Sequence, residues 1–382
     1  MKALLVKICQ KFDCVTDLRS FLVKHPLLVL EIGFRPALDS SQPYGFNVEE
    51  TVPCDRWLRQ KQRTLDNKML QALFRRTVHH LQLEIPGLGE TVVIDTKHIY
   101  AWVKENNPRE FIPNRFDPNK QPVGDPDCRL GVKRSSNQDE SEDAPAKVVK
   151  EYLWGYGTGI VAATYPEYGD VVLAEYTLPF NEADSTYFDP LYKRLVETIG
   201  FRPKNFAGDA AFDAWHIYQP FAEVDGMAAI PLNLRGHPQP KLGPGGYHLC
   251  PQGVEMFPSY QFNHGQGYQA QLLRCPRLFP TKMAAVCNHP QFIKGGCIKQ
   301  VNIEAGGWMR VQLDRQSDAY KQLYKKRTAS ERINSQAKAL GIERPKVRNG
   351  DSVVNMNTLT YIVINARALQ RVRNLKAQAR PP

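Results

Sequence analysis

Residues 154–178 read WGYGTGIVAATYPEYGDVVLAEYTL, and this stretch decides the fold. It contains two runs rich in apolar and β-branched residues, Trp154–Thr164 and Val171–Leu178. The residues between them, Pro166–Gly169, have the composition of a tight turn, because proline and glycine supply backbone angles that strands do not. The stretch therefore predicts two antiparallel strands joined as a hairpin.

Short elements of alternating type flank this hairpin. A β-branched run, Thr91–Asp95, precedes it and is expected to be a buried strand with a carboxylate at its tip. After the hairpin we expect a helix at Ser185–Ile199, which ends at Gly200, and then a strand at Asn205–Asp209. A second helix at Ala210–Ala222 and a last strand at Met227–Leu232 follow. This order predicts an α/β fold with a mixed sheet, in which two antiparallel pairings precede parallel crossovers.

The rest of the chain separates into regions of different composition. Residues 1–85 read as helical, with the strongest apolar periodicity in Arg56–Leu83, and both a packing module and a DNA-binding module remain open there. A proline-rich stretch at about 104–149 reads as a surface loop inserted in the core. We expect a helical N-terminal region at 1–85, the first part of the core at 86–234, a β-rich insertion at 235–307 and the second part of the core at 308–382. In this last part we expect two helices, Tyr320–Leu340 and an amphipathic Val353–Leu375 that leads into a basic tail.

The net charge of the chain, +11, is concentrated at one end. Residues 320–382 contain fourteen basic and three acidic residues, an excess equal to the charge of the whole chain. Such a local excess indicates a polyanionic partner, either nucleic acid or an anionic membrane surface. No apolar run approaches the length of about 18 residues that a spanning helix needs. The start of the chain lacks a signal-peptide pattern, so we expect a cytoplasmic protein.

Three carboxylates stand out by their placement. Asp95 and Asp209 each end an expected core strand, and Glu331 lies on the late helix. Carboxylates that converge from different elements are suitable ligands for Mg²⁺, and two such ions about 4 Å apart promote phosphoryl transfer. Each acid also has a simpler interpretation, because aspartate commonly closes a strand at a turn and Thr328-Ala-Ser-Glu331 fits a helix-capping box.

The neighbourhood of Glu331 favours the chemical interpretation. Tyr324, Arg327, Glu331 and Lys338 fall within an arc of about 60° if residues 320–340 form one helix. One helix face would then carry a carboxylate beside a phenol, a guanidinium and an ammonium. On an isolated helix these are ordinary charge pairs, whereas beside a phosphodiester the cations would bind phosphate oxygens.

These residues carry a resemblance to a known family. Tyr324-x2-Arg327-x3-Glu331-x6-Lys338 is similar to the Y-(2)-R-(3)-E-(6)-K signature of a large branch of bacterial insertion-sequence DDE transposases. Asp95-Thr96 resembles the first aspartate motif of that family, and Gly208-Asp209-Ala-Ala-Phe-Asp213 resembles the second. Asn181–Ser185 also resembles a recurrent family segment, and the likeness extends over about residues 90–375.

The resemblance implies a ribonuclease-H-like core in which Asp95, Asp209 and Glu331 form the acidic, metal-binding triad. It implies a two-metal Mg²⁺ site, with Mn²⁺ as a substitute, that nicks a transposon end and transfers the freed strand into target DNA. Tyr324, Arg327 and Lys338 would contact DNA phosphates. The implied partners are double-stranded DNA, as terminal inverted repeats and target, and a second copy of the chain in a synaptic homodimer. The implied setting is the bacterial nucleoid and not a membrane, and the alternative is a catalytically inactive or domesticated DNA-binding relative.

Two weaker features complete the sequence picture. Cys250, Cys275, Cys287 and Cys297, with His248 and His289 nearby, offer ligands for one structural Zn²⁺. Their spacings of 25, 12 and 10 residues lack the close CxxC pair, so we favour buried free thiols. Trp308 offers a ring for stacking on an unpaired base, although a tryptophan of the core is the commoner case.

Overall fold

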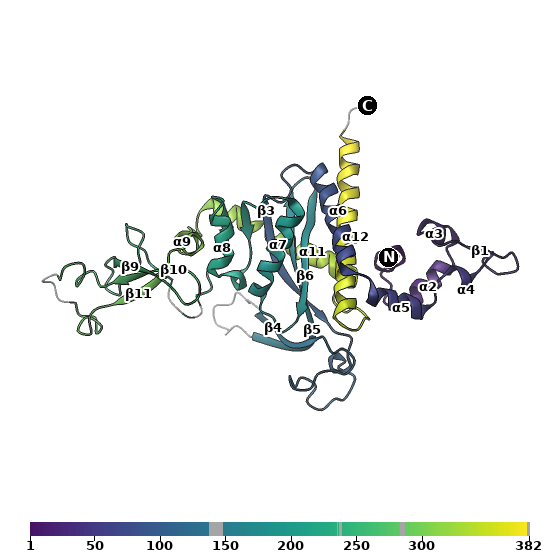
Figure 1. The fold of residues 1–382 in the computed structure, drawn as a ribbon, viewed down its shortest axis with the longest axis horizontal. Helices are drawn as coiled ribbons and strands as arrows, with labels where there is room; N and C mark the ends of the chain where they lie inside the picture. The colour runs from purple at the N-terminus through teal and green to yellow at the C-terminus, as the bar shows by residue number, and fades with distance from the viewer. Residues whose placement is uncertain (137–147, 235, 237–238, 283–286, 380–382) are drawn as a thin grey trace, which may run out of the picture. The chain divides into compact units, whose positions relative to one another are not determined.

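The fold was analysed in a computed structural model of residues 1–382, which describes all of them except 137–147, 235, 237–238, 283–286 and 380–382 (Figure 1). The chain divides into two compact units. Unit 1 comprises Met1–Gly89, Val93–Phe201 and Thr328–Pro382, and unit 2 comprises Glu90–Val92 and Arg202–Arg327. Both units combine helices with strands, so the α/β class is confirmed.

A six-stranded sheet contains the predicted hairpin and the strands that were expected before and after it. Its strands are β3 (Thr91–Tyr100), β4 (Arg129–Ser136), β5 (Val148–Tyr165), β6 (Gly169–Pro179), β7 (Asn205–Ala207) and β8 (Met227–Ala229). The order is β4-β5-β3-β7-β8, and β6 also pairs with β5. Strands β3, β4 and β6 run antiparallel to β5, whereas β7 and β8 are parallel. The sheet is therefore mixed, as the order of the elements predicted.

The β5–β6 hairpin forms the buried centre of unit 1. Its turn closes with a hydrogen bond from the Tyr168 amide to the Tyr165 carbonyl, and Gly169 follows with a φ of +79° that favours glycine. Val161 pairs with Ala174 across the ladder, and both side chains are buried. The apolar runs that identified the hairpin in the sequence are thus the residues that leave water when the sheet is covered.

The sequence suggested that the proline-rich stretch at about 104–149 is a surface loop, and residues 137–147 of it lie outside the described residues. The described part is not wholly a loop. It contains β4 and a short 3-10 helix, η1 (Lys104–Asn106), and β4 pairs with the first half of β5 from Arg129↔Gly155 to Ser136↔Val148. Asp125 is fully buried there and accepts a hydrogen bond of 2.7 Å from the Tyr156 hydroxyl. The expectation was wrong because β5 extends beyond its apolar run, and the extension provides a partner for a mostly polar strand.

Helices make up the N-terminal region, as predicted. They are α1 (Lys2–Cys9), α2 (Val15–Val23), α3 (Pro26–Glu31), α4 (Val48–Thr51), α5 (Asp55–Thr64) and α6 (Asn67–Glu84), with a two-stranded pair β1 (Ala37–Leu38) and β2 (Phe46–Asn47). The periodic segment Arg56–Leu83 is divided between α5 and α6. Asp66 causes the division, because its side chain accepts a hydrogen bond from the Lys68 amide and so caps the start of α6.

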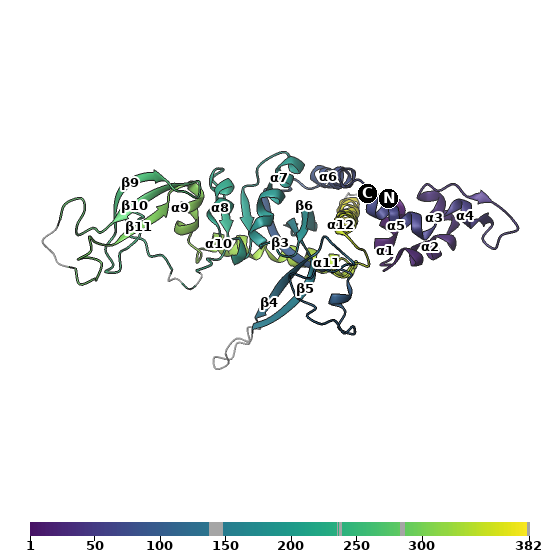
Figure 2. The same ribbon diagram turned by 60° about the horizontal axis from the view of Figure 1, so that its bottom comes forward.

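Unit 1 is completed by η2 (Asp184–Tyr187), α7 (Phe188–Ile199), α11 (Thr328–Ala339) and α12 (Gly350–Gln378). Helix α12 lies beside α6 in both views (Figures 1 and 2) and also packs on β6. Its first half is buried almost all round and is not amphipathic, in contrast to the prediction, because α1, α5 and α11 pack on this helix as well as α6 and β6. Asn365 makes two bonds to Val172 of β6, accepting from its amide at 2.9 Å and donating to its carbonyl at 2.7 Å.

A buried carboxyl group lies beneath α12. Glu175 of β6 has a fully buried side chain that accepts hydrogen bonds from Thr358, at 2.8 Å, and from Gln71. Arg194 is the nearest cation, at 3.9 Å. Burial raises the pKa of Glu175 above its ordinary value of 4.5, although Arg194 and the two hydrogen bonds oppose that rise.

We expect Glu175→Gln to increase the free energy of unfolding at neutral pH. The pKa is higher in the folded state, so wild-type stability decreases as the pH rises from about 4.5 towards the folded pKa. An amide avoids this loss, and each unit of pKa elevation that it removes is worth about 1.4 kcal/mol. Urea denaturation at several pH values measures the effect, with Glu182→Gln at an exposed position as the control. If the free energy of unfolding depended on pH in the same way for Glu175→Gln and wild type, the prediction would be wrong.

Unit 2 contains the parallel pair β7 and β8, a separate three-stranded sheet and several short helices. The sheet has the antiparallel order β11-β10-β9, formed by Phe257–Asn263 (β9), Gln269–Arg274 (β10) and Ile298–Asn302 (β11). The helices are η3 (Ala210–Phe212), α8 (Trp215–Ala222), α9 (Ala305–Gln312) and α10 (Asp318–Lys325). The part of residues 235–307 that the structure describes is therefore β-rich, as expected (Figure 2).

The single helix expected at Tyr320–Leu340 is two helices. Helix α10 ends at Lys325 and α11 begins at Thr328, and the residues between them form a turn in which the Arg327 amide donates to the Tyr324 carbonyl. The boundary between the two units lies at the same place. The 60° arc predicted for Tyr324, Arg327, Glu331 and Lys338 assumed an unbroken helix, so it does not hold across this turn.

Candidate active site

Asp95 lies in the middle of β3 and not at its tip. The strand continues to Tyr100 because β5 pairs with it from Val93↔Ala162 to Tyr100↔Gly155. The polar residues after Asp95 ended the strand in the sequence interpretation, whereas the partner strand extends it. Asp95 is half-buried and is paired with Ile160 of β5.

Helix α11 is hydrogen-bonded to Asp95. The Asn334 side-chain amide donates to Asp95 Oδ2 at 3.0 Å, and the Thr96 backbone amide donates to Asp95 Oδ1 at 2.9 Å. Asn334 stands three residues after Glu331, a spacing that places both side chains on one side of a helix. The contact brings the helix that carries Glu331 to the strand that carries Asp95. Sequence analysis missed Asn334, although its spacing from Glu331 was the available signal.

Arg332 anchors α11 to the sheet. Its guanidinium makes two bonds of 2.7 Å to the carboxylate of Asp170 on β6 and one of 3.2 Å to the Thr164 hydroxyl. The Asp170 side chain is 7% exposed, so this paired arrangement fixes the helix firmly. Arg332 was counted in the C-terminal basic excess, but its charge is used within unit 1.

A chain of three charges lies beside Asp95. Lys97 follows it on the same side of β3 and lies 3.7 Å from Glu343, which in turn lies 3.1 Å from Lys338 of α11. Burial alone would raise the pKa of Glu343, but the two ammonium groups outweigh it and hold that pKa below its ordinary value. Lys338 is 64% exposed and so still presents positive charge to solvent.

The opposite face of β3 is held by the segment Asn181–Ser185. Thr96 donates a hydrogen bond of 2.6 Å to Asp184 of η2. Because neighbouring residues of a strand point to opposite faces, this bond fixes β3 from the side away from Asp95. The segment that was singled out in the sequence thus helps to fix the strand that bears the first aspartate.

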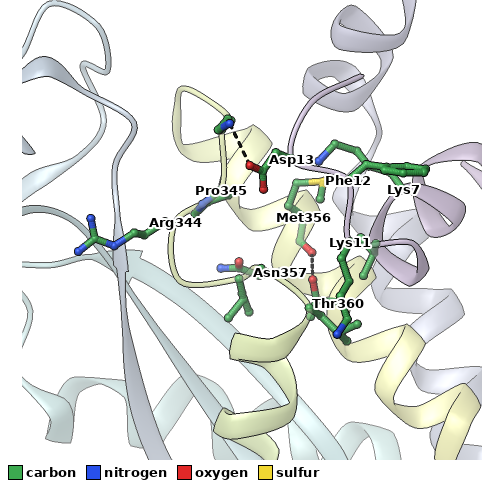
Figure 3. Close-up of a pocket in the computed structure, with 14 residues that line it drawn as sticks. Lys7, Lys11, Phe12, Asp13, Arg344, Pro345, Met356, Asn357 and Thr360 are labelled. Carbon is green, nitrogen blue, oxygen red and sulfur yellow. Dashed lines mark hydrogen bonds and ion pairs between the residues drawn. The ribbon is translucent and has the colours of Figure 1, made fainter. Parts of the chain in front are cut away.

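Basic and aromatic side chains gather near the end of β3. Arg344 lies 4.0 Å from the ring centroid of Tyr100, and Arg348 lies 5.2 Å from that of Trp102, both distances suited to cation–π contact. A pocket here is lined by Lys7, Arg59, Arg63, Trp102, Lys346 and Arg348, which we name the basic groove. Asp13 also lines it and pairs with Lys346 at 2.9 Å. Figure 3 shows the adjoining pocket, where Lys7 and Asp13 face α12 while Arg344 extends away.

The second aspartate motif belongs to unit 2. Asp209 caps η3, since its side chain accepts a hydrogen bond of 2.9 Å from the Ala211 amide. Four residues later, Asp213 has a fully buried side chain that binds Arg310 through two bonds of 2.7 and 2.8 Å. The Tyr218 hydroxyl and the Asn233 backbone amide also donate hydrogen bonds to Asp213, at 2.9 and 2.8 Å. The two aspartates therefore differ in setting, one half-buried at a helix start and one locked in a network.

The remaining predicted residues of unit 2 form aromatic groups. Tyr324 stacks on Tyr320 with ring centroids 5.8 Å apart, and Arg327 lies 5.9 Å from the Tyr324 ring. Trp308 lies on α9, half-buried, with its ring edge-to-face against Tyr247. It lines a pocket together with Trp215, Tyr268 and Lys299, so it is neither wholly a core residue nor freely exposed.

The structure thus brings Asp95, Asn334, Lys97 and Lys338 together around α11 in unit 1, while Asp209, Tyr324, Arg327 and Trp308 belong to unit 2. Among the described residues, no group of three His, Cys, Asp or Glu side chains is arranged to hold a metal ion. The triad of Asp95, Asp209 and Glu331 stays a prediction.

A carboxylate such as that of Asp95 is the kind of hard oxygen ligand that Mg²⁺ takes, and this ion keeps several of its waters. In the described part of the chain, Asn334 Oδ1 is buried and accepts no hydrogen bond. Such an atom is suited to accept a hydrogen bond from an ordered water.

For the Mg²⁺-dependent cleavage that the sequence predicts, Asn334→Ala is expected to reduce activity about 10- to 100-fold, because it removes the group that hydrogen-bonds to Asp95. The reduction should appear as a higher Mg²⁺ concentration for half-maximal cleavage, which a metal titration measures. Ser335→Ala, at an exposed position of the same helix, is the matched control. Unchanged metal dependence of Asn334→Ala would show that the contact is only structural.

Comparison with known proteins gives no family for this chain, since no family model and no curated protein matches it. No described helix is long and apolar enough to cross a membrane. What the chain does must be inferred from its own residues.

Proposed function

We propose that this chain is a DDE transposase that cleaves transposon ends with Mg²⁺ and joins them to target DNA. The observation that carries this proposal is the 3.0 Å bond from Asn334 to Asp95, which joins the strand of the first aspartate to the helix of Glu331. Two of the three expected ligands thereby belong to one connected substructure. The third, Asp209, follows β7 in unit 2.

The sheet supports a ribonuclease-H-like core for this function. Its antiparallel strands β3, β5 and β6 come first in the chain, and the parallel pair β7 and β8 follows them. This is the succession predicted from the order of the elements in the sequence, and it is compatible with the ribonuclease-H-like core that the resemblance implies.

The proposed chemistry is phosphoryl transfer at a DNA phosphodiester. When bound, Mg²⁺ would activate the attacking oxygen and stabilise the leaving oxygen, held by Asp95, Asp209 and Glu331. Asn334 orients Asp95, and the Arg332–Asp170 pair fixes the helix from which Glu331 projects. Lys97 and Lys338 place positive charge beside Asp95, where the anionic substrate is expected.

The basic groove supports DNA as the partner. It combines four exposed cationic side chains, Arg59, Arg63, Lys346 and Arg348, with one exposed tryptophan, and its one acid is already paired with Lys346. Cations near an aromatic ring suit both the phosphates and the bases of nucleic acid. The two transposon ends and the target would be bound by a homodimer.

The function is tested by incubating the purified chain with a duplex from the inverted repeats that flank its gene, in the presence of Mg²⁺. A nick at the repeat end, absent with EDTA and absent for Asp209→Asn, is the expected result. Binding without any nick would favour the second candidate, a DNA-binding relative that has kept the fold but lost catalysis. A nick that persists in Asp95→Asn, Asp209→Asn and Glu331→Gln would refute the proposed site.

Salt dependence tests the basic groove separately. Arg348→Ala is expected to weaken binding to all DNA sequences alike and to decrease the slope of log affinity against log salt by about 1. Fluorescence anisotropy over a salt series measures both quantities. Lys24→Ala removes one charge from an exposed site outside the groove and is the control. Equal slopes for the two variants would exclude the groove from DNA binding.

A further inference from the structure

Two cysteines of unit 2 lie opposite each other in the three-stranded sheet. Strand β10 pairs with β11 up to Arg274↔Ile298, so the next residues in each direction, Cys275 and Cys297, face each other across the ladder. A Cβ atom built on Gly296 would lie 3.4 Å from the Cys275 sulfur, which shows how closely the chain before Cys297 approaches Cys275. Residues separated by 22 positions in the sequence are thus neighbours in the fold.

A third cysteine joins this end of the sheet through β9. Phe257 of β9 pairs with Arg274, and the Met256 amide just before it donates to the His248 carbonyl. Cys250 follows in a tight turn, in which its amide donates to the Val254 carbonyl and the Gly253 amide donates back to it, both at 2.8 Å. The turn therefore lies one strand beyond Cys275.

The fourth cysteine, Cys287, belongs to a segment that reaches Cys297. His289, two residues after Cys287, lies 3.4 Å from the Cys297 sulfur. The four cysteines therefore lie on chain segments that meet at one end of this sheet, and no two of them form a disulfide.

The placement of these thiols is not that of ordinary core cysteines. Cys275 is buried, but Cys250, Cys287 and Cys297 are only half-buried. The two outer strands are also largely exposed, with Tyr260 of β9 at 55% and Ile298 of β11 at 68%, while the central strand β10 is buried. A small sheet whose outer strands bury so little apolar surface usually needs a disulfide or a metal to hold it.

We propose that Cys250, Cys275, Cys287 and Cys297 bind one structural Zn²⁺ ion. Four thiolates form a closed tetrahedral ligand set that suits Zn²⁺ and not Mg²⁺. Binding of the ion releases the four thiol protons to solvent. Among the described residues the side chains do not form a closed ligand set, so zinc binding requires the four cysteine side chains to turn toward one another. The sequence favoured free thiols because it lacks a CxxC pair. In the structure, the pairing of β10 with β11 brings Cys275 and Cys297 together although they are far apart in the sequence.

The zinc content of the full-length chain tests this proposal. After purification without chelator, elemental analysis is expected to find about one zinc ion per chain. Cys275→Ser and Cys297→Ser should each retain less than about a tenth of it, whereas Cys54→Ser, an exposed cysteine of unit 1, should retain all of it. Zinc that remains in both site variants, or zinc lost from Cys54→Ser, would overturn the proposal.

Cobalt substitution covers the case in which a variant does not fold. The wild-type chain, stripped of metal and reconstituted with Co²⁺, should show intense thiolate-to-cobalt charge-transfer absorption, and Zn²⁺ should displace it. Absence of that absorption would overturn the proposal. Neither measurement uses DNA or Mg²⁺, so the zinc site can fail while the transposase proposal stands, and the reverse also holds.

Discussion

Replacement of Glu331 by glutamine is expected to decrease Mg²⁺-dependent DNA cleavage by at least about a thousandfold, which corresponds to about 4 kcal/mol of transition-state stabilisation. Glutamine keeps the size of the side chain but removes the negative charge that a metal ligand needs. Glu331 is exposed on α11, so the fold of unit 1 should be unaffected. The loss should fall on catalysis and leave DNA affinity within about twofold.

Single-turnover cleavage and DNA-binding titrations measure these two effects separately. Ser335→Ala, exposed on the same helix, should cleave at the wild-type rate. If Glu331→Gln cleaved within about tenfold of wild type, Glu331 would be no more than a helix-capping residue. That outcome would restore the simpler interpretation of Thr328-Ala-Ser-Glu331.

Asp213→Ala is expected to destabilise unit 2 by about 3–5 kcal/mol, because it leaves the Arg310 guanidinium partly buried without its partner. The same change removes the acceptor for the Tyr218 hydroxyl and the Asn233 amide. A loss of this size is a large part of the stability of a typical domain. The variant should therefore unfold at markedly lower denaturant concentration.

Asp209→Asn is the matched comparison for this prediction. It lies four residues earlier in the same motif, and it should keep wild-type stability while it loses cleavage activity. Thermal and chemical denaturation of both variants, followed by hydrogen exchange in unit 2, distinguishes them. If Asp213→Ala were as stable as Asp209→Asn, the buried network would contribute little to folding.

The elements with strong local patterns were predictable from the sequence. The hairpin of β5 and β6 has long apolar runs and a proline–glycine turn, and α7 ends at Gly200 in the left-handed region. These features depend on neighbours in the sequence. The structure places them within a few residues of the expected bounds, except that β5 begins at Val148 and not at Trp154.

The errors occurred where distant residues decide the structure. Strand β4 forms only because β5 is long enough to pair with it, and β3 extends past Asp95 for the same reason. No glycine or proline marks the turn at Lys326–Arg327, so the periodicity of the sequence predicted one continuous helix where the structure has α10 and α11. For the site, the acids were chosen by motif, whereas Asn334 and the role of Asp213 depend on tertiary contacts.

The position of α12 has a consequence for biosynthesis. Residues 350–378 lie against α6 and β6, and Asn365 is bonded to β6. At roughly 5–20 residues per second, the ribosome delivers this helix many seconds after α6 has emerged. Until then the faces of α6 and β6 that α12 covers are exposed to solvent, so the core of unit 1 is completed only late in translation. A chain that ended before residue 350 would leave this face exposed and is expected to be degraded by proteases.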